Sequence, residues 1–424
     1  MAWGLLNSPH RQRKVSLSRM MYDAYQSYAD VSNRLRLAAA SGERLLRLWT
    51  STPYASPARC FQAYCELVAL LGFTHKRPCY GIDRIATHDG AFVDVVEEPV
   101  YATPFATLLR FSRKDAENLP RVLLVAPMSG HFATLLRGTI RTLLQDHDVY
   151  VTDWINTRDI PLAAGVFGMD EFVQHLIDFI RFLGQPAHVV AVCQPTVAAL
   201  AAVAAMAEDN DPAQPASLTL MAGPIDISVA PTKVNEFATS KPIEWFRDNV
   251  IGVVPRGLPG AGRKVYPGFL QIAGFMSMNV DRHANAFMDM FRHRVEGEHE
   301  KADRIRTFYE EYFAIMDLDA RFYLETIETV FHKNALSAGK LLFKGRPVTP
   351  RAIKKTFLLT VEGEKDDICA VGQTLAAQDL CSGLRPYMKS HHLQAGVGHY
   401  GVFNGKRWDN QIYPVLRDHI QNSV

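Results

Sequence analysis

Patterns of buried strands and of helices alternate along the middle of the chain. Short apolar runs rich in Val, Leu and Ile are typical of strands that are buried on both faces. They lie at 121–126, 148–154, 188–192 and 217–223, after two further predicted strands at 92–100 and 104–111. Segments of helical spacing separate the buried runs. The alternation predicts an α/β fold with a mostly parallel, doubly wound sheet and helices on both faces.

This alternation stops near Pro224 and resumes near Lys355. Residues 226–350 are mostly helical in pattern, contain no predicted buried strand and are rich in Phe, Met and Tyr. They are interpreted as a helical cap inserted over the carboxyl edge of the sheet, before the last strands at 355–361 and 390–395 and a last helix at 409–420. The sequence is therefore divided into four segments: an N-terminal helical segment (1–85), the first part of the core (86–225), the cap (226–350) and the second part of the core (351–424).

The N-terminal segment has helical spacing from about Ser18 to Leu71. One stripe of apolar residues is expected to pack on the main domain, although it could instead adsorb to an apolar surface. Its members are Met21, Tyr25, Tyr28, Val31 and Leu35. The basic residues before Ser18 lack the apolar block of a secretory signal, and a frayed basic tail is favoured over an organelle-transit peptide.

Composition excludes several classes of function. The chain has 424 residues, of which 48% are hydrophobic and 21% charged, with a formal net charge of +2. This balance is ordinary for a globular protein and gives no reason to expect a nucleic-acid partner. No apolar run approaches the length of a transmembrane segment. The six cysteines form no CxxC pair and no zinc-binding spacing, so neither a metal nor disulfides are expected.

A single stretch predicts a nucleophile. The strand His188–Val192 turns at Cys193 directly into an Ala-rich helix that begins at Thr196. This is the pattern of a nucleophile elbow, with Ala191 and Pro195 where glycines are usual. The helix N-terminus would favour a thiolate at Cys193. The competing interpretation is that Cys193 is one more small buried residue.

An acid and a histidine follow later predicted strands. Asp366 and Asp367 come after the strand 355–361, and His399 comes after the last strand. Nucleophile, acid and histidine in this order are typical of α/β-hydrolases, in which His399 would deprotonate Cys193 and the acid would orient the imidazole. Side-chain alternation favours Asp366 over Asp367 as the acid.

An acyl transfer also needs donors for the oxyanion. The expected donors are the backbone N–H groups of Gln194, next to the nucleophile, and of Met128, after the strand 121–126. Ser129 is the alternative to Met128. His131, in the same loop, either lines the site or is only a histidine at the start of a helix.

Several further stretches resemble the intracellular polyhydroxyalkanoate (polyhydroxybutyrate) depolymerases, from about residue 20 to the C-terminus. The most specific is the Cys-Gln-Pro elbow. The matching stretches are Val192–Thr196, Thr152–Trp154, Pro161–Gly165, Phe308–Tyr312, Phe322–Thr326, Glu362–Ile368 and Gly398–Phe403. The resemblance implies an α/β-hydrolase with the triad Cys193, Asp366 and His399 and no cofactor. It implies hydrolysis of amorphous polyester at granules in the cytoplasm, with release of 3-hydroxyalkanoates.

Two alternatives remain at this point. A polyhydroxyalkanoate synthase or related acyltransferase also uses Cys, Asp and His, but usually keeps glycines around the Cys and has a His after the Asp, where this chain has Asp367. A granule-associated binding protein without activity would have lost a triad member, and none is lost. The sequence leaves open the preferred side-chain length, the size of the products, water or a thiol as acceptor, and whether the chain forms a homodimer.

Overall fold

One nine-stranded sheet forms the centre of the molecule. The computed structural model describes residues 9–47, 56–116 and 118–423. The strand order is β1-β2-β3-β5-β4-β6-β7-β13-β14. The strands are β1 (Arg84–Ala86), β2 (Phe92–Ala102), β3 (Ala106–Arg113), β4 (Arg121–Val125), β5 (Asp148–Trp154), β6 (Ala187–Val192), β7 (Ser217–Met221), β13 (Phe357–Gly363) and β14 (Lys389–Gln394).

The sheet is antiparallel at one edge and parallel in the rest. β1, β2, β3 and β5 pair antiparallel in succession, and every pairing from β5 through β4, β6, β7 and β13 to β14 is parallel. All residues of β6 and β7 are buried, as their β-branched and apolar runs predict. This order, with crossovers between parallel strands, is the α/β-hydrolase fold, and the predicted fold class is confirmed.

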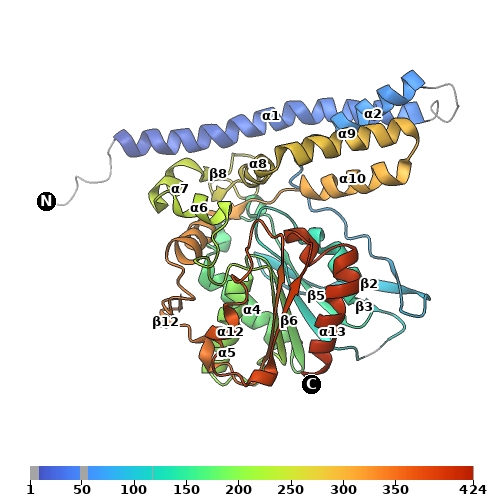
Figure 1. Cartoon of the computed structure of the whole chain (residues 1–424). Helices are drawn as coiled ribbons and strands as arrows, with labels where there is room; N and C mark the ends of the chain where they lie inside the picture. Colours follow the sequence, from blue (N-terminus) through green and yellow to red (C-terminus); the bar gives the residue numbers. More distant parts are fainter. Residues whose placement is uncertain (1–8, 48–55, 117, 424) are drawn as a thin grey trace.

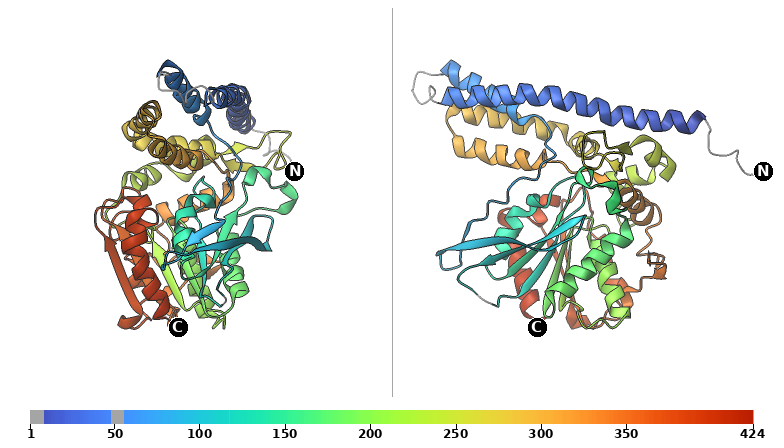
Figure 2. Two further views of the ribbon diagram at one scale, coloured as in Figure 1. Left: turned by 90° about the vertical axis from the view of Figure 1, so that its right-hand side faces the viewer. Right: turned by 180° about the vertical axis from the view of Figure 1, so that it is seen from behind.

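Helices cover both faces of the sheet (Figures 1 and 2). They are α3 (Arg137–Leu143), α4 (Met169–Leu183), α5 (Thr196–Glu208), α12 (Ala377–Leu380) and α13 (Tyr413–Gln421). α5 is buried along almost its whole length, which explains why its sequence is Ala-rich rather than amphipathic. At the N-terminus of α4, the Glu171 side chain accepts from the N–H of Gly168 at 2.8 Å.

The segment between β7 and β13 forms a layer above the carboxyl ends of the strands (Figure 1). Its helices are α6 (Lys233–Thr239), α7 (Ile243–Asn249), α8 (Gly268–Met278), α9 (Val280–Glu296), α10 (His299–Tyr312), α11 (Ala320–Thr326) and the π-helical turn η4 (Ile327–His332). The prediction that this segment has no buried strand is wrong. β8 (Gly252–Val253), β9 (Lys264–Tyr266) and β10 (Leu318–Asp319) form a small antiparallel sheet, too short to leave a hydrophobic period in the sequence.

Two N-terminal helices cross the top of this layer, and the start of α1 projects beyond the rest of the molecule (Figures 1 and 2). α1 (Pro9–Arg47) begins well before Ser18, and the expected frayed tail is helical from Pro9 on. α2 is Ser56–Leu70, whereas residues 1–8 and 48–55 lie outside the described part of the chain. The expectation that the apolar stripe packs on the main domain is wrong for Tyr28, Val31 and Leu35, which are 64–71% exposed.

Within the described residues, no helix combines the length and the apolar character needed to cross a membrane.

Candidate active site

Cys193 occupies a strained turn between β6 and α5. Its φ is 66°, a left-handed conformation that non-glycine residues adopt rarely and that is common at functional sites. Two hydrogen bonds hold the turn. The N–H of Cys193 donates to the Met221 carbonyl at 2.8 Å, and the N–H of Ala199 donates to the Pro195 carbonyl at 2.8 Å. Pro195 is therefore the N-cap of α5.

The close packing of this turn depends on a glycine outside the elbow itself. Ala191 and Pro195 replace the usual flanking glycines, and Ala191 is completely buried between β4 and β7. Gly223, just after β7, faces the start of α5, where a Cβ would lie only 1.8 Å from Thr196 Oγ1. Because Gly223 has no side chain, the start of α5 can pack closely against the end of β7, although the elbow itself lacks the usual glycines.

His399 and Asp366 are hydrogen-bonded to each other. His399 Nδ1 lies 2.8 Å from Asp366 Oδ2, and both side chains are buried. The other carboxylate oxygen of Asp366 accepts the N–H groups of Ile368 at 2.9 Å and Cys369 at 2.8 Å. Asp367 is exposed, and its carboxylate accepts a long bond from Asn279. The geometry therefore pairs His399 with the carboxylate that alternation favoured.

The protonation of His399 depends on its two neighbours. Burial by itself would lower the pKa of the imidazole, but Cys193 and the Asp366 carboxylate, through charge and hydrogen bonding, hold that pKa well above its usual value. The imidazole is hydrogen-bonded to the carboxylate of Asp366 and lies near Cys193, close enough for the sulfur to influence its pKa. Such an arrangement can hold an imidazolium beside a thiolate, which is the activated form of a cysteine nucleophile.

A buried glutamate secures the loop that follows Asp366. Glu362, at the end of β13, accepts the N–H groups of Gly372, Thr374 and Leu375 at 2.7–3.0 Å. Thr374 in turn bonds the N–H and the carbonyl of Gly223, beside the elbow. Glu362 belongs to a stretch that carries the family resemblance, but the sequence alone indicated no role for it.

The expected oxyanion donors lie around the same cavity as Cys193. Met128, Ser129 and Gln194 all line it. In the part of the chain that the structure describes, the N–H groups of Met128 and Gln194 donate to no protein acceptor. His131 is not among the lining residues. It is buried against Phe275 and Tyr312, and burial lowers its pKa to about 4.

The cavity beside Cys193 has a volume of about 400 Å³ and a mostly apolar wall. Its aromatic members come from the cap, and the sequence predicted only that the cap is rich in such residues. They are Phe237, Phe246, Tyr266, Phe275, Phe322, Tyr323 and Phe331. Tyr266 and Tyr323 stack with ring centres 3.8 Å apart. The arrangement suits an aliphatic chain whose carbonyl lies against the sulfur of Cys193.

A second cysteine lines this cavity, but its surroundings are different. Cys369 is 2% exposed, and burial raises the pKa of its thiol well above the usual value. Cys65 and Cys381 are also buried, as expected for small apolar residues, whereas Cys79 is exposed. Only Cys193, among the described cysteines, combines partial exposure with a place beside the imidazole of His399.

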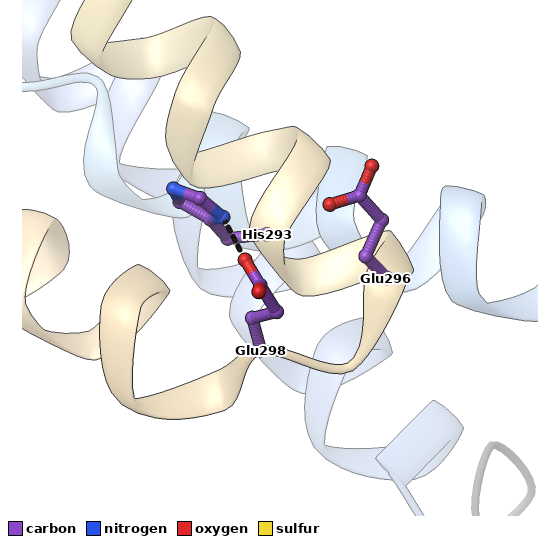
Figure 3. Close-up of side chains that lie close together, drawn as sticks. All are labelled: His293, Glu296 and Glu298. Carbon is purple, nitrogen blue, oxygen red and sulfur yellow. Dashed lines mark hydrogen bonds and ion pairs between the residues drawn. The ribbon is translucent and has the colours of Figure 1, made fainter.

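The close-up in Figure 3 draws a candidate group of metal ligands at the α9–α10 turn. His293 and Glu298 already form an ion pair with each other, and Lys301 donates to the second oxygen of Glu298 at 2.7 Å. Glu296 is exposed. Because these groups neutralise one another, the cluster gives no reason to infer a bound cation.

A sequence model described as the PHB de-polymerase C-terminus matches residues 222–423, which include the cap, Asp366 and His399. This part of the chain thus resembles the PHB depolymerases. Together with the α/β-hydrolase fold, the match supports the hydrolysis of esters as the activity.

Comparison with solved structures returns hydrolases at low similarity. A putative lipase from Acinetobacter baumannii AYE is 13% identical over 77% of this chain and 93% of its own, with a TM-score of 0.44. A 2-hydroxy-6-oxo-6-phenylhexa-2,4-dienoate hydrolase from Rhodococcus sp. strain RHA1 is 14% identical over 78% and 99%, with a TM-score of 0.44. At these scores the substrates of the two enzymes say nothing about the substrate of this protein. No curated protein matches the chain significantly.

Proposed function

We propose that this protein hydrolyses amorphous intracellular polyhydroxyalkanoate, in particular poly-3-hydroxybutyrate, and releases 3-hydroxyalkanoate monomers or oligomers. The observation that carries the proposal is the buried hydrogen bond between His399 and Asp366, close to Cys193 and to the apolar cavity that Cys193 lines. The resemblance to the PHB depolymerases supports a polyester as the substrate.

In the proposed reaction, His399 accepts the thiol proton of Cys193, and the sulfur attacks the ester carbonyl. Asp366, bonded to Nδ1, stabilises the imidazolium and leaves Nε2 free to face the sulfur. The N–H groups of Gln194 and Met128 stabilise the oxyanion. His399 then protonates the departing alkoxide, which leaves a thioester on Cys193. Water, deprotonated by His399, attacks this thioester and releases the acid and the free thiol.

The family resemblance also supports a place of action at polyester granules in the cytoplasm. The substrate is insoluble and aliphatic, and the aromatic wall of the cavity could guide such a chain to the sulfur. Because the cap covers the cavity, the chain must enter by a movement of the cap or along its edge.

The test is release of soluble 3-hydroxybutyrate from amorphous poly-3-hydroxybutyrate particles by wild type and by Cys193→Ala. We expect release by wild type and none by the variant, because alanine cannot form the acyl-enzyme. Cys79→Ala, which replaces an exposed cysteine, is the matched control and should retain full activity.

Other outcomes would overturn the proposal in distinct ways. Full release by Cys193→Ala would remove Cys193 as the nucleophile. No release by wild type, with polymer formed from 3-hydroxyacyl-CoA instead, would identify a synthase. Binding of wild type to the particles without any turnover would leave a granule-binding protein.

A further inference from the structure

Two residues that line the catalytic cavity have solvent-inaccessible polar atoms with no hydrogen-bond partner among the described residues. Both amide atoms of Gln194, Nε2 and Oε1, are inaccessible to solvent and unpaired, and so is the hydroxyl of Thr326. Both residues line the cavity, Gln194 from the elbow and Thr326 from the end of α11. By contrast, the side-chain oxygen of Asn235, in the same wall, accepts from Thr232 and Gln373.

Unpaired buried amides are rare in proteins, because the lost hydrogen bonds to water are not replaced. A cavity that bound only plain aliphatic acyl chains would be better lined by an apolar side chain at position 194. The unpaired groups therefore indicate a ligand that carries oxygen close to its reacting carbonyl. The π-helical turn η4, which starts directly after Thr326, is a further irregularity of a kind that is frequent at functional sites.

We propose that Gln194 and Thr326 bind the oxygen on carbon 3 of the acyl chain whose carbonyl Cys193 attacks. This inference rests on the proposed function, because poly-3-hydroxybutyrate carries such an oxygen in every unit, as the next ester or as the terminal hydroxyl. The amide of Gln194 suits both forms. Its NH₂ group donates to an ester oxygen, and its carbonyl accepts from a hydroxyl.

The position of Gln194 in the chain agrees with this role. It follows Cys193 directly, so its backbone N–H adjoins the oxyanion, and the residue lines the cavity that receives the acyl chain. Carbon 3 lies only two bonds from the attacked carbonyl carbon. The aromatic side chains around it, such as Phe322 and Phe331, provide the apolar surface for the methyl branch. Gln194 and Thr326 would then select 3-oxygenated acyl groups over plain fatty acyl groups.

The experiment compares p-nitrophenyl 3-hydroxybutyrate with p-nitrophenyl butyrate, which differ only in the oxygen on carbon 3. Gln194→Met keeps the length of the side chain and the backbone N–H. We expect the ratio of kcat/KM for the 3-hydroxybutyrate ester to kcat/KM for the butyrate ester to fall about tenfold in this variant, mainly through the KM of the 3-hydroxybutyrate ester. Thr326→Val should shift the same preference to a smaller extent.

Two controls separate substrate binding from a structural role. Thr219→Val also removes a buried unpaired hydroxyl, but in β7 rather than in the cavity wall, and should leave both esters unaffected. The melting temperature of Gln194→Met should equal or exceed that of wild type, because the amide makes no bond that the protein could lose. Equal losses on both esters, or no loss on either, would overturn the inference. If wild type cleaves neither ester nor the polymer, the proposed function itself fails.

Discussion

At the scale of single residues, the three catalytic candidates are far apart in the sequence but close together in the folded protein. Cys193 is held in a left-handed turn, and His399 lies between its sulfur and the carboxylate of Asp366. Both Asp366 and Asp367 lie in the turn after β13, which ends at Gly363, and the hydrogen bond to His399 distinguishes Asp366 from its neighbour. The same carboxylate also accepts two backbone N–H groups, which fixes its orientation toward the imidazole.

Asp366→Asn tests the pairing with His399. The amide removes a negative charge that raises the pKa of His399, so that pKa should fall, as measured by NMR titration of the imidazole. Activity should fall by a factor on the order of 10³–10⁴, because the imidazolium loses its stabilising partner. Asp367→Asn is the control, because the Asp367 side chain is exposed. This variant should leave both the pKa of His399 and the enzymatic activity unchanged. An unchanged His399 titration in Asp366→Asn would contradict the pairing.

At the scale of elements, the elbow is assembled by three strands rather than by its own sequence. β6 leads to Cys193, β7 supplies the Met221 carbonyl and Gly223, and the loop after β13 fixes Gly223 through Thr374. The departure from the usual glycines at 191 and 195 is tolerated because Gly223 gives α5 its close approach to the sheet.

Gly223→Ala should therefore destabilise the protein by at least about 1–3 kcal/mol, because the new methyl group overlaps Thr196. Gly274→Ala is the matched control. It lies within α8, nothing is within 4 Å of its added Cβ, and it should raise stability slightly through helix propensity. The measurement is the free energy of unfolding in urea for both variants. Equal stabilities of the two variants would show that α5 can shift to accept a side chain at 223.

At the scale of the whole molecule, the N-terminal helix is attached to the cap through a buried acid. Tyr22 on α1 is fully buried and donates to Asp317, which also accepts the N–H of Gly268 at 2.9 Å. Burial raises the pKa of Asp317 to about 6, and the hydrogen bond from Tyr22 opposes this shift. The acid thus links α1 to the first residue of α8 in the cap.

Tyr22→Phe should weaken this attachment in a pH-dependent way. Asp317 is ionised in the unfolded chain above its usual pKa but binds a proton in the folded chain up to about pH 6, so its burial reduces stability as pH rises through this range. Without the Tyr22 hydroxyl, the ionised carboxylate of Asp317 loses a hydrogen bond, so the pKa of Asp317 in the folded protein rises further. Stability then continues to fall up to a higher pH. We expect a loss of about 1.5–3 kcal/mol at pH 8 and a smaller loss at pH 5.

Denaturant unfolding at the two pH values measures this difference. Tyr28→Phe removes the hydroxyl of a tyrosine that is 71% exposed and should change stability at neither pH. A loss for Tyr22→Phe that is the same at pH 5 and pH 8 would contradict the role of the Asp317 charge.

By itself, the sequence determined the α/β fold, the parallel core strands and the three residues at the elbow, the acid loop and the histidine loop. These depend on local properties: β-branched runs form buried strands, and loops after parallel strands meet at one edge of the sheet. Only the tertiary structure decided that Gly223 lets α5 pack closely beside the elbow. It also decided that Phe322 and Phe331 line the cavity and that Val31 and Leu35 are exposed. Each of these outcomes depends on contacts, made or missing, between segments far apart in the chain, and such contacts leave no period in the sequence.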